Sequence, residues 1–394
     1  MKSIVGYSLN EDSFMCGIET CQKATKDLDN AKIGFLYTSI NNNIKQVVKG
    51  VESAHKMPII GCTSSNGVMI PDGIINSPNG YSAMLTLDDS KLNVGVACHE
   101  AGKDARIIGR KVAIQAVENA KTSRAPAYFY MVASPKDEED YLMGIQDVIG
   151  RVPMFGGSAA DDLIDGNWKI ICNDKIISDG VAVAFFYTDN EINTCFASGY
   201  SETNNVGLIT EVENERTLVS IDDMSALKKY AHWINSTTKD LIGDNLLLSS
   251  ITKPLGVKDP LGNLTIVRHP MFGDDMGTKS TIDDAIRLGN KVVEKTAIVQ
   301  LEATKEELIN SVADTLIKVR NKMYNHPIAY ILMHSAMRRI YLKEEMELVY
   351  ENVLKETKGV PFIMPFTLGE YGYEEHSSNI CGGLMLSFTA IGKN

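Results

Sequence analysis

No stretch of 18 consecutive apolar residues occurs in the 394-residue sequence, so no transmembrane helix is expected. The amino terminus also has few apolar residues, because polar Asn10, Glu11 and Asp12 follow the first positions. A secretory signal would need a longer apolar segment there. We therefore expect a soluble cytoplasmic protein without membrane insertion.

Positive charge is also scarce. The chain has 39 lysine and arginine residues against 50 aspartate and glutamate residues, which gives a net charge of −11. Such a charge favours solubility but repels phosphate backbones and anionic lipid headgroups. Nucleic acid is therefore not an expected partner.

Cysteine and histidine are few and widely spaced. Seven cysteines, an odd number scattered over a long chain, do not resemble the dense framework of a small disulfide-bonded fold, so free thiols are expected. Cys16 and Cys21 would point about 140° apart on a helix, which does not suit a zinc knuckle. No two histidines are three or four positions apart. No metal site is predicted.

One layout of elements recurs three times along the chain. Each copy has a strand, a helix, a second strand, a glycine-bearing loop and a third strand. A proline stands at the start of the second strand in every copy, where its missing N–H is tolerated. The copies span residues 32–87, 127–186 and 328–388, and the prolines are Pro58, Pro153 and Pro361.

The strands of these copies are nearly continuous apolar runs, which are typical of strands buried on both faces. A strand–helix–strand crossover makes the first two strands of a copy parallel. Asp-Gly and Asn-Gly pairs then mark hairpins before the third strand in the first two copies. We predict an α/β (α+β) fold whose mixed sheets are built from repeated strand–helix–strand–strand units.

The residues between the second and third copies follow another pattern. A hairpin is predicted over 208–212 and 216–221, followed by a helix over 227–241. Thr304 and Glu307 have the spacing of a capping box, which predicts the start of a further helix.

Two domains are expected because 394 residues exceed the size at which a single core stops growing. We place the division near residues 200 to 222, after the polar segment 201–205, and take residue 210 as the boundary. Residues 1–210 then hold two copies of the unit, and residues 211–394 hold the hairpin, the helices and the third copy.

Ligands in α/β sheets gather beyond the carboxyl ends of parallel strands. The loops after the second strands span 61–67, 156–162 and 368–372, and each carries glycine, which lets a ligand approach backbone N–H groups. We expect the three loops to face one cavity.

Four short segments resemble a known family. Residues 61–67 resemble the G-C-(S/T)-(S/T)-x-G segment of the FIST N domain, and residues 156–161 resemble its G-G-x-A-x-D segment. Residues 366–372 resemble the G-E-x-G segment of the FIST C domain, and residues 331–338 match its apolar strand followed by arginine. Ser335 stands where the family often has cysteine.

The resemblance covers about residues 30 to 390 and implies a sensory module in intracellular signal transduction. Its ligand would be a small molecule such as an amino acid, and a subgroup of the family is associated with haem and nitric oxide. No kinase or cyclase pattern follows in the sequence, so the output is expected from a separate protein such as a kinase or regulator.

The predicted ligand site combines the three loops with two charged residues of the third copy. If the ligand is an amino acid, Arg338 would hold its carboxylate, because a guanidinium binds a carboxylate bidentately. Asp161 or Glu370 would then hold the ammonium group. The full predicted lining is Cys62, Thr63, Ser64, Gly157, Ser158, Asp161, Arg338 and Glu370.

Three alternatives stay open at this point. Cys62 could serve as the nucleophile of an enzyme, although no histidine lies near it in sequence. Haem could bind through His99, His232 or His334 in a nitric-oxide sensor. Arg338 and Glu370 could simply pair with each other. A binding module without a cofactor is the preferred interpretation.

Overall fold

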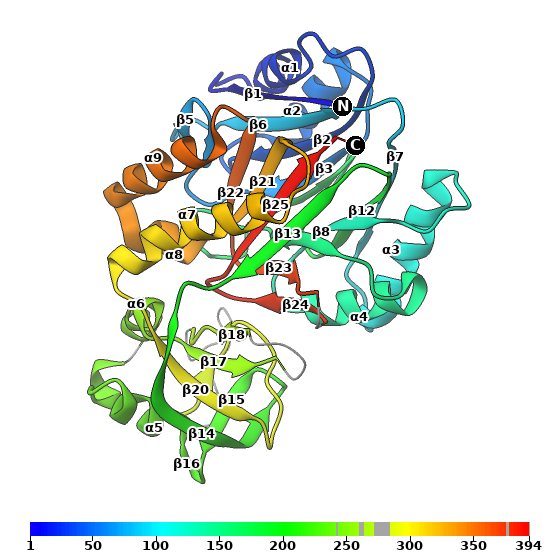
Figure 1. Ribbon diagram of the computed structural model, residues 1–394. Coiled ribbons are helices and arrows are strands. Elements are labelled where there is room, and N and C mark those ends of the chain that lie inside the picture. Colours follow the sequence, from blue (N-terminus) through cyan, green and yellow to red (C-terminus); the bar gives the residue numbers. More distant parts are fainter. Residues whose placement is uncertain (242, 260–263, 272–283, 376–377, 394) are drawn as a thin grey trace.

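The computed structural model of the chain has two bodies (Figure 1). The upper body contains three six-stranded sheets with helices on their outer sides, and the lower body, residues 201–302, contains a fourth sheet. The structure describes residues 1–394 except 242, 260–263, 272–283, 376–377 and 394.

The three predicted copies all form, and in each one the first two strands are parallel while the third is antiparallel to the first. The first copy has β2 (Ala31–Thr38), α2 (Ile44–Ala54), β3 (Ile59–Thr63) and β6 (Ser82–Asp88). The second has β8 (Tyr128–Ala133), α4 (Glu138–Ile149), β9 (Met154–Ser158) and β12 (Gly180–Tyr187). The third has β21 (Pro327–Ser335), α8 (Ala336–Leu342), η2 (Lys343–Glu345), α9 (Met346–Thr357), β22 (Phe362–Thr367) and β25 (Leu386–Gly392).

The prolines occupy equivalent places in the three copies. Each lies directly before the second strand, and its carbonyl accepts a hydrogen bond of 2.9–3.0 Å from an amide of the first strand. The proline at this position thus begins the parallel ladder without needing an N–H of its own.

Each copy belongs to a larger unit than the sequence patterns indicated. A further strand lies beside the third strand of every copy, and a further helix packs against the helix already predicted. The additional strands are β1 (Lys2–Ser8), β7 (Asn93–Glu100) and β13 (Ile192–Ala197). The additional helices are α1 (Ser13–Ala24), α3 (Ala105–Ala120) and α7 (Lys305–Asn321), the last with the predicted capping box.

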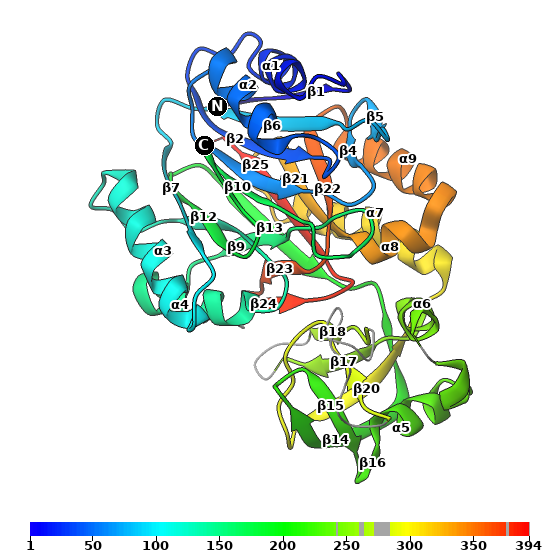
Figure 2. The ribbon, with the colours of Figure 1, turned by 180° about the vertical axis from the view of Figure 1, so that it is seen from behind.

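The three units complete one another's sheets by exchanging hairpins in a cycle. The hairpin of the first unit joins β22 of the third, that of the third joins β9 of the second, and that of the second joins β3 of the first. Figure 2 shows β4 beside β22. The hairpins are β4 (Val68–Ile70) with β5 (Gly73–Ile75), β10 (Ile170–Cys172) with β11 (Lys175–Ile177), and β23 (Glu370–Tyr373) with β24 (Asn379–Gly382).

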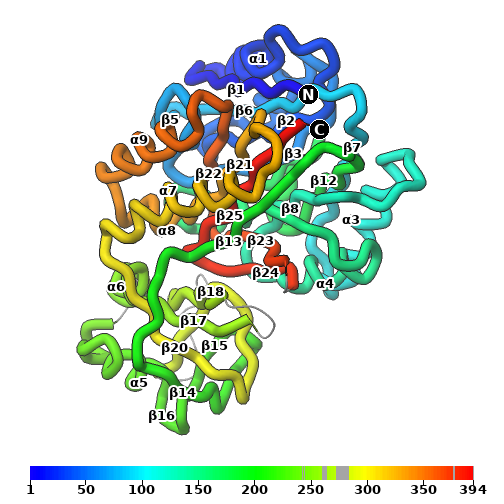
Figure 3. The backbone as a smooth tube through the Cα atoms, in the orientation of Figure 1, coloured from blue at the N-terminus to red at the C-terminus, as the bar shows by residue number. Residues whose placement is uncertain are grey.

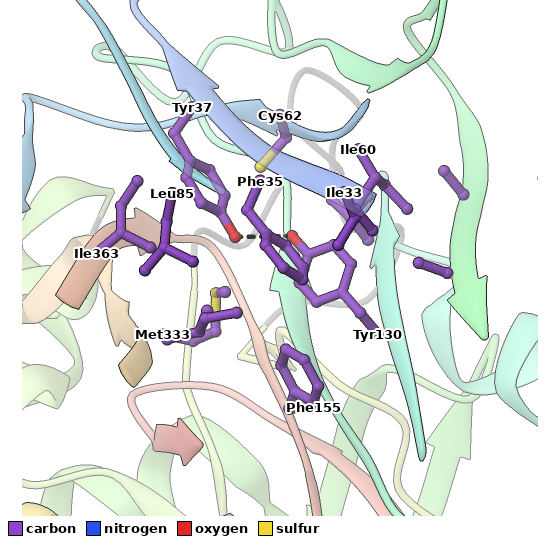
Figure 4. Packing of buried hydrophobic residues seen from close by; sticks show 14 of the residues in the cluster. Ile33, Phe35, Tyr37, Ile60, Cys62, Leu85, Tyr130, Phe155, Met333 and Ile363 are labelled. Atoms are coloured by element: carbon purple, nitrogen blue, oxygen red, sulfur yellow. Dashed lines mark hydrogen bonds between the residues drawn. The ribbon is translucent and has the colours of Figure 1, made fainter. Parts of the chain in front are cut away.

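The sheets enclose a central core to which all three units contribute (Figure 4). Phe35 packs edge-on against Tyr130 with ring centroids 5.3 Å apart, and Met333 and Ile363 of the third unit join the same cluster. The hydroxyls of Tyr37 and Tyr130 are 3.0 Å apart. Alternate residues of the same strands face outward and pack under the helix pairs, as a period of two requires.

The lower body is inserted between β13 and α7, and Figure 3 shows the chain passing between the bodies at both ends of the insertion. Its sheet packs with short helices around a second core, which upper-body residues such as Phe196, Met337 and Met385 also join. Its strands are β14 (Ser201–Glu213), β15 (Thr217–Ile221), β16 (Met224–Ser225), β17 (Leu255–Lys258), β18 (Thr265–Arg268), β19 (Ile286–Arg287) and β20 (Ala297–Glu302). Its helices are α5 (Ala226–Trp233), η1 (Thr238–Asp240) and α6 (Asp244–Thr252).

The predicted hairpin over 208–221 is confirmed as β14–β15, but the helix expected over 227–241 is too long. The helix ends at Trp233 because Asn235 takes a left-handed conformation with φ 56°, and a separate helical turn follows. The division of the chain at residue 210 stays a prediction. In space, the third unit packs with the first two.

Candidate functional site

The ends of the three parallel second strands meet, as the sequence patterns led us to expect. The amide of Ala160 donates to the carbonyl of Thr63 at 3.1 Å, and the amide of Ser158 donates to the carbonyl of Gly369 at 2.8 Å. The amide of Ser65 donates to the carbonyl of Phe366 in the third unit at 3.1 Å. The glycine-bearing loops therefore contact one another directly, and much of their backbone is already hydrogen-bonded.

The predicted residues of the first loop are fully buried. The hydroxyl of Ser64 donates to the carbonyl of Gly67 at 2.6 Å and accepts from the amide of Phe366 at 2.8 Å. The hydroxyl of Thr63 accepts from the amide of Lys169 at 2.9 Å. Burial raises the pKa of the Cys62 thiol, which keeps it protonated and disfavours a role as nucleophile.

The second loop is covered by the hairpin of the third unit. Gly157 lies opposite Glu370 in the β9–β23 ladder, and the hydroxyl of Ser158 is 2.6 Å from that of Tyr371. A Cβ on Gly157 would come within 2.8 Å of the carbonyl of Gly369, so glycine allows this close approach.

Asp161 organises the segment that follows β9. Its buried carboxylate accepts four backbone hydrogen bonds of 2.9–3.2 Å, from the amides of Leu163, Asp165, Gly166 and Asn167. These contacts use both carboxylate oxygens, so the side chain shapes the loop from within.

Arg338 and Glu370 are also enclosed. The guanidinium of Arg338, with no exposed surface, donates to the carbonyls of Ser198 and Leu308 and to the hydroxyl of Ser311. The carboxyl of Glu370 accepts from the hydroxyl of Thr367 and an amide, and burial raises its pKa to about 8. A contact of any of the eight predicted residues with a ligand stays a prediction.

A pocket of about 300 Å³ lies next to this junction, between the two bodies, and we call it the interbody pocket. It opens beyond the carboxyl ends of β8 and β9, where a ligand of an α/β sheet is expected. The upper body contributes Pro135, Lys136, Glu138, Ile164, Asp165, Gly166, Trp168, Asp179 and Leu368. The lower body contributes Arg216, Met271, Arg287, Leu288 and Gly289. None of the eight predicted residues lines it, but Asp161 holds the loop that does.

Two residues lining the interbody pocket have unusual backbone conformations. Lys136 has φ 110° and the β-branched Ile164 has φ 57°. Both lie in a region that residues other than glycine rarely adopt. Such strain persists only where the surrounding structure holds it, and it concentrates at binding sites.

An ion-pair network joins the bodies beside the pocket. Arg216 of the lower body is buried and lies 3.3 Å from the carboxylate of Glu138 and 2.5 Å from that of Glu139. Lys291 pairs with Asp140 at 2.6 Å. We call these contacts the α4 clamp, because all three acids lie in the first turn of α4, at the positive end of its dipole.

The clamp includes a carboxyl group with a shifted pKa. Burial raises the pKa of Glu138 to about 7, and the charge of Arg216 opposes this shift. Sequence reasoning missed the interbody pocket and the clamp. The available signal was four consecutive acids, Asp137 to Asp140, shortly after the carboxyl end of a buried strand.

The FIST N domain model matches residues 32–224 and the FIST C domain model matches residues 226–373. The chain belongs to the FIST family. FIST domains are recognised as small-ligand sensory domains in signal transduction. This family assignment confirms the resemblance found in the sequence segments.

Comparisons beyond the FIST models show little. No curated protein matches the chain. A structure described as "Cyanuric acid hydrolase: evolutionary innovation by structural concatenation" aligns over 100% of both chains with 8% identity and a TM-score of 0.32. The PurLQS structure from Thermotoga maritima aligns over 100% of this chain and 72% of its own, with 7% identity and a TM-score of 0.24. Likenesses this weak carry no argument about function.

The three histidines considered for haem lie apart. His232 is exposed on α5, while His334 is fully buried and its pKa is well below the ordinary value, chiefly through burial. His99 lines a groove beside β7. Haem binding stays a prediction. Among the described residues, no group of three or more potential ligands could hold a metal ion, and no helix is long and apolar enough to cross a membrane.

Proposed function

We propose that this FIST chain is a cytoplasmic sensor that binds an amino acid in the interbody pocket and acts by binding rather than catalysis. The observation that carries the proposal is the position of the pocket, which lies beyond the carboxyl ends of β8 and β9 and is closed by residues of the lower body. Its volume of about 300 Å³ is at the small end of the range for ligand pockets.

The lining suits a small zwitterion. Lys136 and Arg287 offer cationic groups for a carboxylate, while Asp165 and Asp179 offer carboxylates for an ammonium group. In this proposal Lys136 and Arg287, which line the pocket, bind the carboxylate that the sequence patterns assigned to Arg338.

The rest of the lining is apolar and suits an aliphatic or aromatic side chain. Trp168, Met271, Leu288 and Leu368 form this part. The indole N–H of Trp168 is buried and has no hydrogen-bond acceptor among the described residues. A buried indole N–H usually has an acceptor, so a ligand or water near Trp168 would complete its contacts.

Ligand binding in this pocket would become a signal through the position of the lower body. A ligand that contacts both bodies favours the arrangement in which both sets of contacts can form. The chain enters and leaves residues 201–302 at two ends, and the α4 clamp adds a non-covalent contact, so a ligand between the bodies can bias their position. A separate protein, such as a kinase or regulator, would read this position.

A thermal-shift screen of the full chain against the common amino acids tests the proposal. A ligand present at 100 times its dissociation constant should stabilise the chain by about 2.7 kcal/mol. Lys136→Gln and Asp165→Asn should each abolish most of the shift, because each removes one charge from the pocket. Asp174→Asn, an exposed acid outside the pocket, is the matched control and should keep the full shift. A screen without any shift, or a shift that both pocket variants retain, contradicts the proposal.

A further inference from the structure

Cys98 and Cys172 lie together at the junction of two sheets. Cys98 is in the edge strand β7 of the second unit's sheet, and Cys172 ends β10, which has joined the sheet of the first unit. Both cysteines line one groove, and β10 contacts β7. Sequence reasoning could not pair them, because the hairpin exchange brings the two strands together.

This pair differs from the other cysteines of the chain. Cys98 is half-buried, and all six other cysteines are buried. The side chain of Cys172 lowers the pKa of Cys98, and Lys175 also lowers it, against burial and the negative charges of Asp174 and Glu100. The side chain of Cys98, together with burial, raises the pKa of Cys172. Cys98 is the more accessible thiol of the pair, so an external reagent meets it first.

The pair opens into a groove of about 620 Å³ between β7, α3 and the β10–β11 hairpin. Lys111 and Lys175 outnumber the one lining acid, Asp174, so the groove has a net positive charge, and Gln115 and Asn119 add hydrogen-bonding groups. A small anionic molecule can therefore reach Cys98, whereas Cys172 has only 3% of its surface exposed. The groove is not part of the interbody pocket, since the two share no residue.

We propose that Cys98 and Cys172 form a dithiol site that reacts with low-molecular-weight disulfides carrying carboxylates. The Cys98 thiolate attacks one sulfur of the disulfide, the S–S bond breaks, and one thiolate leaves. Cys172 then loses its proton and attacks the Cys98 sulfur of the mixed disulfide, which expels the second thiolate. The two cysteines become one disulfide, and the reagent is reduced to two thiols.

The disulfide would fix one sheet to another. It would tie β10, which follows the pocket residue Trp168 after one intervening residue, to β7 at the edge of the neighbouring sheet. The segment that connects the interbody pocket to the hairpin would then have less freedom in the oxidised chain. The chemistry of the dithiol does not depend on the proposed sensory role.

Incubation of the reduced full chain with glutathione disulfide, followed by alkylation and peptide mass analysis, tests the site. We expect a disulfide between the peptides of Cys98 and Cys172, which dithiothreitol should reverse. Cys16, Cys21 and Cys62 should remain thiols, whether or not the alkylating reagent reaches them in the folded chain. Cys172→Ser should retain glutathione as a stable adduct on Cys98. Cys98→Ser should react with glutathione disulfide at least about tenfold more slowly than the unchanged chain, because the accessible thiolate is gone.

Cys195→Ser is the matched control, because it removes a buried thiol that does not line the groove and should oxidise like the unchanged chain. The unchanged chain provides the decisive result even if a variant folds poorly. A stable glutathione adduct on Cys98 of the unchanged chain, a disulfide between other cysteines, or no reaction at Cys98 would overturn the proposal.

Discussion

Single buried carboxyl groups should set part of the pH response of the chain. Burial raises the pKa of Glu370 from 4.5 to about 8, so the folded chain keeps a proton that the unfolded chain releases. As the pH rises from about 4.5 to 8, this group therefore lowers the free energy of unfolding by up to about 1.4 kcal/mol per pH unit. Glu370→Gln should lack this slope. Urea unfolding of both chains at pH 5 and pH 8 checks it, and parallel pH curves would rule the effect out.

Arg338 should act as a structural residue. Its buried guanidinium binds two carbonyls and the hydroxyl of Ser311, which would all lose their donor in Arg338→Ala. We expect a loss of roughly 3 kcal/mol or more of stability without ligand, because buried polar groups are left unpaired. The amino-acid-induced thermal shift should remain. An unchanged melting temperature with a lost ligand shift would instead return Arg338 to the binding site.

Asp161 provides a second residue whose structural and ligand roles can be separated. Replacing it with asparagine removes one of the two oxygens that accept four amides, so Asp161→Asn should destabilise the ligand-free chain by about 2 kcal/mol. Asp165→Asn, in the same loop, should cost less than about 0.5 kcal/mol because the side chain is exposed. Chemical denaturation measures both, and equal losses would contradict the assigned role of Asp161.

At the scale of helices and strands, the α4 clamp should decide how firmly the lower body is held. Removing one partner of a buried ion pair costs about 3–5 kcal/mol, so Arg216→Met should weaken the contact of β15 and residues 286–291 with α4. Arg106→Met breaks a pair with Asp147 on the exposed side of α4 and should cost about 1 kcal/mol or less. Hydrogen exchange should rise at residues 138–140 and 286–291 in the first variant only. Similar exchange in both variants would show that the clamp does not hold the bodies together.

The sequence patterns predicted elements where the signal was local. Apolar runs, the prolines before the second strands and the cap at Thr304 all act within a few residues, so β2, β8, β21 and α7 could be expected. The additional strands β1, β7 and β13 were missed, partly because residues 201–302 separate β13 from the rest of its unit. A signal was present in their spacing, since they begin at residues 2, 93 and 192.

Non-local pairing explains why the sequence did not predict which residues line the interbody pocket. The loop that begins at Leu368 turns into β23, whose Glu370 covers Gly157, so the loops fill one another's strand ends. Register between distant strands is not encoded in any short segment. The interbody pocket lies at the edge of the sheets to which the rule for ligands beyond parallel strands pointed. Only Leu368 of the three predicted loops lines the cavity, and the other lining residues come from the lower body, the segment after Asp161, the segment after β8 and Asp179.

At the scale of the whole molecule, the hairpin exchange should make the upper body unfold as one cooperative unit, because no unit has a complete sheet alone. The two tryptophans report on different bodies, Trp168 on the upper and Trp233 on the lower. In Trp233→Phe, the fluorescence reports on Trp168 alone, and it should follow the same transition as the upper-body part of the far-ultraviolet circular dichroism signal. Separate transitions for Trp168 and the remaining upper-body signal would contradict cooperative exchange.

Hydrogen exchange with and without the amino acid that gives the largest thermal shift tests the central claim most directly. Because the interbody pocket is lined from both bodies, binding should protect residues 135–138 and 164–168 of the upper body and residues 286–289 of the lower body together. Residues 61–65, at the enclosed loop junction, should show no added protection. Protection confined to residues 61–65, 157–161 and 370 would place the ligand at the loop junction and contradict a ligand held between the bodies.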